Sequence, residues 1–248
     1  MPVFRTQMPR IYELKDLIDN PTSPDAYFRN FDKNVQDSPH HVRAIYLCWE
    51  KELQGLDLSA WEFLKTEASP RLTHKDRTGR GWQALFDILN QASAYNHLKA
   101  IGCSNVRFIP RAERKTPDLE GILDSGRVLC EVKTINISQK EVRAREESKV
   151  RSIATRLDDR FFRVLHSDIT EAKNQLDAYD ATGGARHYVY IIPCFDDILG
   201  ECKEGYFRQI DQYLSDNPTP GIHVTFRNNK TPFHKSLTMV NATVDNAC

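Results

Sequence analysis

The sequence has few of the features that mark export, membrane insertion or metal–thiolate chemistry. No run of about 18 consecutive apolar residues occurs, and the first 20 residues contain no uninterrupted apolar segment. The six cysteines are scattered and form no Cys-x-x-Cys pair. That arrangement is atypical of zinc or iron–sulfur ligation and suits a reducing compartment. We therefore expect a cytoplasmic protein that has no membrane partner.

An excess of charge of one sign is also missing. The 248 residues carry 34 Lys and Arg and 34 Asp and Glu, so the formal net charge is zero. This balance excludes a uniformly basic nucleic-acid coat protein and an acidic solvating tail. The charges are nevertheless sorted along the chain, because residues 71–163 hold 19 Lys and Arg against 12 Asp and Glu. A polyanion would be attracted to this part of the chain.

The spacing of apolar residues predicts the order of helices and strands. Helical periodicity dominates residues 11–66 and returns from 81 to 100. Strand-like runs follow at 105–111, 119–123 and 127–135, with Asp124-Ser125-Gly126 as a hairpin turn. Beyond them the sequence predicts helix within 139–163, a second helix from Asp168 to Tyr179, a strand at 187–193, a helix at 206–214, and strands at 222–226 and 236–240.

This order favours an α/β fold with a mixed central sheet flanked by helices. Residues 1–75 would form a helical N-terminal region, and residues 76–248 would form the α/β domain.

Three charged residues are expected to lie close together on the second and third strands. Residues two apart on a strand point to one face, so Glu131 and Lys133 share a side of the third strand. Asp118 stands at the entry to the second strand, and the turn at Gly126 folds that strand beside the third. Two neighbouring carboxylates repel each other and invite a divalent cation, and oxygen ligands suit Mg²⁺ or Mn²⁺.

These residues form a set suited to phosphodiester hydrolysis. A metal that bridges a phosphate and a water would polarise the phosphorus and lower the pKa of the water. Lys133 could orient that water or neutralise the negative charge that develops. The main-chain carbonyl of Val132 is a third candidate metal ligand beside Asp118 and Glu131.

At this point the residues resemble a known pattern. Pro117-Asp118, the 13-residue step to Glu131, and Glu131-x-Lys133 are similar to the active-site signature of the PD-(D/E)XK nuclease superfamily. The order of helix, three strands, helix and strand is similar to the core of that superfamily. On the next helix, Gln175-Leu-Asp-Ala-Tyr179 resembles the Gln-x-x-x-Tyr motif of its RecB-like branch. The resemblance covers residues from about 81 to 193.

The resemblance implies a restriction-endonuclease-like core and a magnesium-dependent phosphodiesterase that cleaves DNA, with cleavage inside a strand as the expected mode. Asp118, Glu131 and the Val132 carbonyl would hold Mg²⁺ or Mn²⁺, Lys133 would be the catalytic cation, and Gln175 would take part in the site. Many members also place a metal-binding Glu on the helix before the first strand. Here Asp87 is the only acid on that helix, which is a departure from the pattern.

Other interpretations of the same residues stay open. Glu131 and Lys133 could be an ordinary charge pair on a solvated sheet face, and Gln175 with Tyr179 could be the polar shoulder of an amphipathic helix. Glu120 is interpreted as a surface charge. As a whole, the chain could instead be a catalytically inactive module of the same fold that binds nucleic acid or a protein partner. A homodimer is the assembly to be looked for in either case.

Overall fold

The computed structural model describes residues 3–37, 40–76, 81–147, 154–196 and 201–227. These residues form two compact units, of which the first ends at Asn96 and the second comprises His97–Arg227. This division lies inside one helix, between Asn96 and His97. The boundary at residue 75 that the sequence suggests stays a prediction.

The first unit is helical, as predicted. Its described elements are α1 (Val3–Gln7), α2 (Pro9–Asp16), α3 (Phe31–Asp37), α4 (His40–Gln54), α5 (Leu58–Ala68), the short 3₁₀ helix η1 (Ser69–Arg71) and most of α6 (Gln83–Ala100). Large aromatic side chains fill its core, among them Trp49, Trp61 and Phe86. The Asp57 carboxylate caps α5 by accepting a hydrogen bond from the Ala60 N–H at 2.9 Å.

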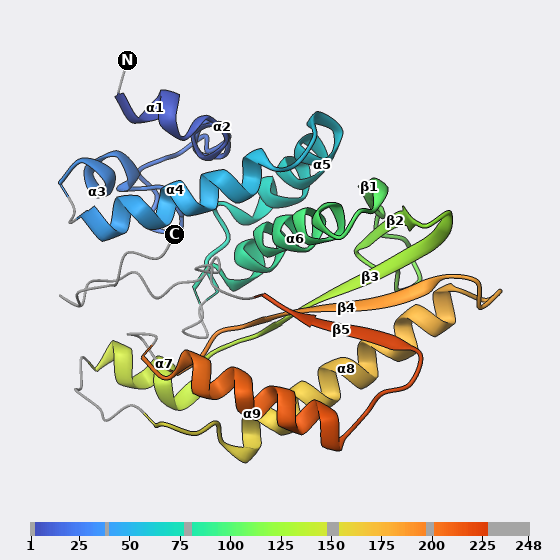
Figure 1. The fold of residues 1–248 in the computed structure, drawn as a ribbon. Helices are drawn as coiled ribbons and strands as arrows, with labels where there is room; N and C mark the ends of the chain where they lie inside the picture. The colour runs from blue at the N-terminus through green and yellow to red at the C-terminus, as the bar shows by residue number, and fades with distance from the viewer. Residues whose placement is uncertain (1–2, 38–39, 77–80, 148–153, 197–200, 228–248) are drawn as a thin grey trace. The chain divides into compact units, whose positions relative to one another are not determined.

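The second unit is built on a five-stranded mixed sheet, which confirms the predicted α/β class. The strands are β1 (Ser104–Phe108), β2 (Leu119–Leu123), β3 (Gly126–Ile135), β4 (Arg186–Pro193) and β5 (Ile222–Phe226), and they lie in the order β1-β2-β3-β4-β5. The pairs β1–β2 and β2–β3 are antiparallel, whereas β3–β4 and β4–β5 are parallel. The helices of this unit are α7 (Gln139–Glu146), α8 (Asp159–Tyr179) and α9 (Lys203–Asp216), and α8 and α9 lie on the same side of the sheet (Figure 1).

The turn between β2 and β3 fixes the register of the hairpin. Asp124 and Ser125 both have positive φ angles, 49° and 64°, which is the conformation of a two-residue type I′ turn. Leu123 therefore pairs with Gly126, and the register runs on until Leu119 pairs with Cys130. The hairpin turn predicted at 124–126 is confirmed.

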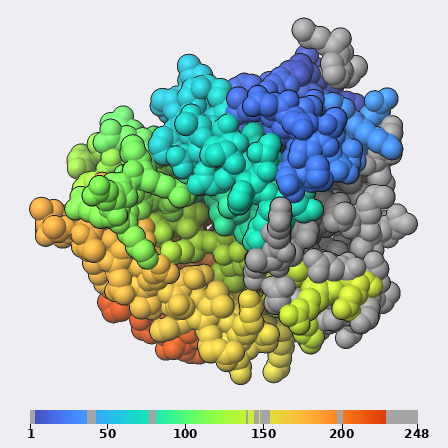
Figure 2. Space-filling view, turned by 180° about the vertical axis from the view of Figure 1, so that it is seen from behind, coloured from blue at the N-terminus to red at the C-terminus, as the bar shows by residue number. Residues whose placement is uncertain are grey.

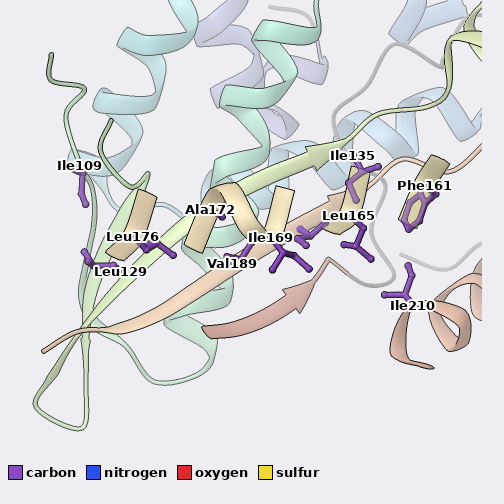
Figure 3. Packing of buried hydrophobic residues seen from close by; sticks show 11 residues of the cluster. Ile109, Leu129, Ile135, Phe161, Leu165, Ile169, Ala172, Leu176, Val189 and Ile210 are labelled. Atoms are coloured by element: carbon purple, nitrogen blue, oxygen red, sulfur yellow. The ribbon is translucent and has the colours of Figure 1, made fainter. Parts of the chain in front are cut away.

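Helix α8 covers the parallel part of the sheet through one apolar stripe. Phe161, Leu165, Ile169, Ala172 and Leu176 follow one another at intervals of three or four residues, so they share one face. Figure 3 shows this stripe directed at strand residues that include Leu129, Ile135 and Val189. Burying each large side chain of this kind contributes about 1.5–3 kcal/mol. The packing therefore decides which side of β3 faces α8.

Some predicted boundaries were wrong. Helix α8 begins at Asp159 and not at Asp168, because the Asp158 carboxylate accepts a hydrogen bond from the Phe161 N–H at 2.9 Å and caps the helix there. Residues 154–158 are not helical, so the helix predicted within 139–163 is not continuous. Strand β1 ends at Phe108, because Pro110 has no N–H to continue the ladder.

Two further predictions have different outcomes. The strand predicted at 236–240 lies outside the described residues. No helix in the described part of the chain is long and apolar enough to cross a bilayer.

Candidate active site

Glu131 and Lys133 lie on the side of β3 that α8 covers. Side chains alternate along a strand, and Leu129 and Ile135 belong to the core beneath α8, so the two odd-numbered residues between them face the same way. Glu131 is only 6% exposed, and the Lys133 side chain is 17% exposed. The Lys133 Nζ lies 3.2 Å from the Glu131 Oε1. This pair is therefore not on a solvated sheet face.

Asp118 is joined to the same strand by its backbone and its side chain. Its N–H donates to the Cys130 carbonyl at 3.1 Å, and its own carbonyl accepts from the Ile109 N–H at 2.9 Å. Its Oδ2 accepts a hydrogen bond from the Val132 N–H at 2.8 Å. Because Val132 separates Glu131 from Lys133, this bond brings the second carboxylate to the strand segment that carries both.

Gln175 connects α8 to β3 and to the loop before β2. Its Nε2 donates to the Glu131 Oε2 at 2.7 Å and to the Thr116 carbonyl at 2.8 Å. One amide nitrogen thus fixes the buried carboxyl group of β3 and the loop that leads to Asp118. The structure therefore brings together Asp118, Glu131, Lys133 and Gln175.

The position of Glu131 is electrostatically unfavourable for a carboxylate. Burial raises the pKa of Glu131 to about 8, and the nearby Asp118 carboxylate adds to the effect, whereas the Lys133 ammonium opposes it. Burial and the charge of Asp118 thus favour the protonated form of Glu131, and the charge of Lys133 favours the ionised form. A cation placed between the two carboxylates would favour the ionised form.

Three residues that sequence reasoning missed also belong to this region. The Glu171 Oε2 lies 3.9 Å from the Lys133 Nζ, and its Oε1 lies 2.8 Å from the Lys115 Nζ. The hydrogen bond from Lys115 lowers the pKa of Glu171, and the positive charge of Lys133 lowers it further. Burial raises the pKa of Asp168, and the charge of Lys133 opposes that rise.

A signal for the two acids was present in the sequence. Asp168, Glu171 and Gln175 each stand directly before a core residue of α8, namely Ile169, Ala172 and Leu176. Spacings of three and four residues place them on one helix face. Of these three residues only Gln175 belongs to the Gln-x-x-x-Tyr motif, but the same helix face also holds the two acids.

Other candidate residues lie elsewhere. The Tyr179 ring lies under two guanidinium groups, with its centroid 5.1 Å from the Arg114 Cζ and 5.5 Å from the Arg127 Cζ. Glu120, which the sequence analysis interprets as a surface charge, pairs with Arg127 and with Arg107, and its side chain is 16% exposed. Asp87 belongs to the first unit, where it accepts a hydrogen bond from the Gln83 amide at 2.7 Å.

The thiol of Cys130 is not suited to nucleophilic chemistry. Its residue is fully enclosed, and burial raises the pKa of the thiol well above its ordinary value. A thiol that is buried and protonated packs as an apolar group. This agrees with the prediction that Cys130 faces away from Glu131.

Two of the candidate metal ligands, Asp118 and Glu131, are carboxylates. Asp118 and Glu131 supply carboxylate oxygens, the type of ligand that Mg²⁺ prefers, and this metal commonly keeps several waters and binds through one or two carboxylates. The described residues contain no group of three or more His, Cys, Asp or Glu side chains arranged around a common point. An ion held here would have Asp118 and Glu131 as its carboxylate ligands, with the Val132 carbonyl and water as further candidates.

A pocket of about 290 Å³ opens beside the site. It lies between α8 and the loop that precedes β2. Its lining consists of Arg114, Lys115, Glu171, Asn174, Gln175 and Ala178. Gln175 lines the pocket, and its amide donates to Glu131, so this one residue connects the pocket with the Glu131 carboxyl group.

Comparison with known proteins identifies no family. No family model matches this chain, and neither a curated protein nor a solved structure does.

Proposed function

We propose that this protein is a magnesium-dependent nuclease that hydrolyses phosphodiester bonds inside DNA strands, on a restriction-endonuclease-like core. The observation that carries the proposal is the convergence of Asp118, Glu131 and Lys133 on one segment of β3, with Gln175 bonded to the buried Glu131. The order of the elements also supports the proposal. An antiparallel β1-β2-β3 meander is followed by helix α8 and the parallel strand β4, which is the order that the resemblance implies.

Each residue has a role that follows from its surroundings. Asp118 and Glu131 would hold the metal together with the Val132 carbonyl, and Mg²⁺ or Mn²⁺ bound there would supply Lewis acidity toward the phosphate and the attacking water. Lys133 is nearly enclosed, so its positive charge acts at short range on the negative charge that develops during hydrolysis. Gln175 orients the Glu131 carboxyl group and the loop that carries Asp118.

A cleavage assay with matched variants tests the proposal. Plasmid, linear duplex and single-stranded DNA would be incubated with wild type, Asp118→Asn and Lys133→Ala in Mg²⁺ or Mn²⁺. Asp211→Asn and Lys173→Ala, which change charges on the outer faces of α9 and α8, are the matched controls. We expect cleavage by wild type and both controls and its loss in the two site variants. Cleavage that persists unchanged in Asp118→Asn and Lys133→Ala would show that the activity lies elsewhere.

A second candidate function is a catalytically inactive module of this fold that binds nucleic acid or a protein partner. The observation that favours it is the pairing of Lys133 with Glu131 and Glu171, together with the finding that the described residues hold no group of three or more His, Cys, Asp or Glu side chains suited to a metal. If wild type binds DNA in the same assay conditions but never cleaves it with either metal, this candidate replaces the nuclease.

A further inference from the structure

A series of positively charged side chains leads away from the candidate site across the second unit. We define the cationic row as Lys115, Arg114, Arg127 and Arg107, which come from the loop before β2 and from strands β3 and β1. On the face shown in Figure 2, the segment around residues 105–125, drawn in green, lies beside the yellow and gold surface of α8. All four cations belong to the same compact unit as the site.

Contacts join the members of the cationic row to one another and to the site. Glu171 joins the row to the site, because its carboxylate lies near both Lys133 and Lys115. The Tyr179 ring joins Arg114 to Arg127, since both guanidinium groups lie over it. Glu120 joins Arg127 to Arg107, with an N–O distance of 2.9 Å to the first and 2.6 Å to the second.

The cationic row is accessible from solvent. The Lys115 side chain is 72% exposed and the Arg107 side chain is 73% exposed, and Arg114 and Arg127 are also exposed. An ion pair between such exposed groups contributes about 0–1 kcal/mol, so a phosphate can replace the Glu171 carboxylate on Lys115 at little cost. Glu120 is less exposed, at 16%, and holds the two arginines in place from beneath.

The chemistry of the cationic row suits a polyanion that carries planar bases. The row carries four positive charges against the two carboxylates of Glu120 and Glu171, so it retains a positive surplus. Guanidinium groups bind phosphate through paired N–H donors, and an aromatic ring flanked by arginines is a common surface for nucleic-acid bases. The pocket lined by Arg114, Lys115, Asn174 and Gln175 lies where the row meets the site.

We infer that the cationic row binds the phosphates of a DNA strand next to the phosphodiester that the site addresses, with the pocket taking the first nucleotide beyond it. This inference rests on the proposed function, because it treats the residues around Lys133 as the reacting end. It adds the path of the bound DNA strand beyond the site, which runs along Lys115, Arg114, Arg127 and Arg107.

Salt-dependent binding tests the inference without any need for cleavage. A fluorescein-labelled 20-base-pair duplex would be titrated with the full chain in EDTA over a series of NaCl concentrations, and anisotropy would give the affinity. Removing two phosphate contacts in Arg107→Ala/Arg114→Ala should reduce the magnitude of the negative slope of the log association constant against log salt by about 1.8. The matched control is Arg163→Ala/Arg208→Ala, which removes the same charge from exposed positions on α8 and α9.

The outcomes separate this inference from the proposed function. A control double variant with the wild-type slope, beside a reduced slope in the row variant, supports the inference, and in a cleaving enzyme the same variant should raise KM and leave kcat unchanged. Equal slopes in the two double variants, or no binding of DNA by wild type, would overturn it. If wild type binds with the expected slope difference but never cleaves, the nuclease proposal fails and the DNA-binding surface stands.

Discussion

Glu131 carries a carboxyl group that is buried beside a second carboxylate, that of Asp118. Its pKa of about 8 lies far above the ordinary value of 4.5. Between these two pH values the folded chain therefore holds a proton that the unfolded chain has lost. The contribution of Glu131 to the free energy of unfolding is fully present below about pH 4.5 and is lost as pH rises through about 8. The metal-free protein is thus destabilised in alkaline solution by its own candidate site.

Replacing Glu131 by Gln should remove this pH dependence. Between pH 6 and pH 9 without metal, wild type should lose stability on the order of a few kcal/mol, because a pKa difference of one unit corresponds to about 1.4 kcal/mol. Glu131→Gln should lose much less over the same range. Urea unfolding in EDTA at the two pH values measures both. An identical pH dependence in wild type and Glu131→Gln would contradict the assignment of the raised pKa to this residue.

Gln175 offers a test of positioning, since its amide contacts Glu131 and Thr116. We expect Gln175→Ala to reduce metal affinity or cleavage about 10–100-fold, as loss of an outer partner of a metal ligand commonly does. Gln212→Ala, on the exposed face of α9, serves as control. Titration of Mn²⁺ by electron paramagnetic resonance separates the loss of metal affinity from the loss of rate. Equal Mn²⁺ affinity and equal rates in the two variants would remove Gln175 from the site.

The residue scale also shows what could be predicted from the sequence. The shared face of Glu131 and Lys133 follows from the two-residue period of a strand, and the approach of Asp118 follows from a two-residue turn, so both are local consequences of the sequence. The neighbourhood of Lys115 and Glu171 is not local, because it depends on how α8 lies across β3. No periodicity in the sequence fixes that placement.

At the scale of elements, α8 shows why boundaries are the hardest part to predict. Its apolar stripe begins at Phe161, yet the sequence analysis started the helix at Asp168, where an acid precedes an apolar run as in a common N-terminal pattern. The cap is in fact Asp158, which lies before the first residue of the stripe. Asp158 and Asp168 both precede apolar residues, and the core contacts of Phe161 and Leu165 favour a helix that begins after Asp158.

The cap of α8 can be tested directly. Asp158→Ala removes the acceptor for the Phe161 N–H and should lower the free energy of unfolding by about 1 kcal/mol. Asp158→Asn retains a capping oxygen and should stay within a few tenths of a kcal/mol of wild type. Urea unfolding followed by circular dichroism measures both changes. An equal loss in Asp158→Asn and Asp158→Ala would show that charge, and not the hydrogen bond, is what matters at this position.

At the scale of the whole molecule, zero net charge conceals an uneven distribution. The part of the chain from residue 71 to 163 has a surplus of seven positive charges, and it contains Asp118, Glu131, Lys133 and the cationic row. A neutral protein can therefore attract a polyanion to one region. The composition alone excludes a basic coat protein, but it does not exclude an enzyme that acts on nucleic acid.

Metal binding should be visible as a change in the stability of the whole chain. A ligand that binds only the folded state at ten times its dissociation constant adds about 1.4 kcal/mol, which raises Tm by roughly 3–5 °C in a chain of this size. We expect such a rise with Mg²⁺ or Mn²⁺ in wild type at pH 8, and none in Asp118→Asn. Differential scanning calorimetry in EDTA and in each metal gives the comparison. A rise of the same size in Asp118→Asn would place the metal elsewhere.

The central claim is that Lys133 acts on a phosphodiester held beside Asp118 and Glu131. The most direct measurement is the single-turnover rate of DNA cleavage by wild type and by Lys133→Met in saturating Mg²⁺, with DNA affinity and Tm determined for both. We predict a rate at least about 100-fold lower in Lys133→Met at unchanged Tm, since loss of one charge-stabilising group commonly costs that much. A Lys133→Met rate within twofold of wild type, or no cleavage by wild type itself, would contradict the claim.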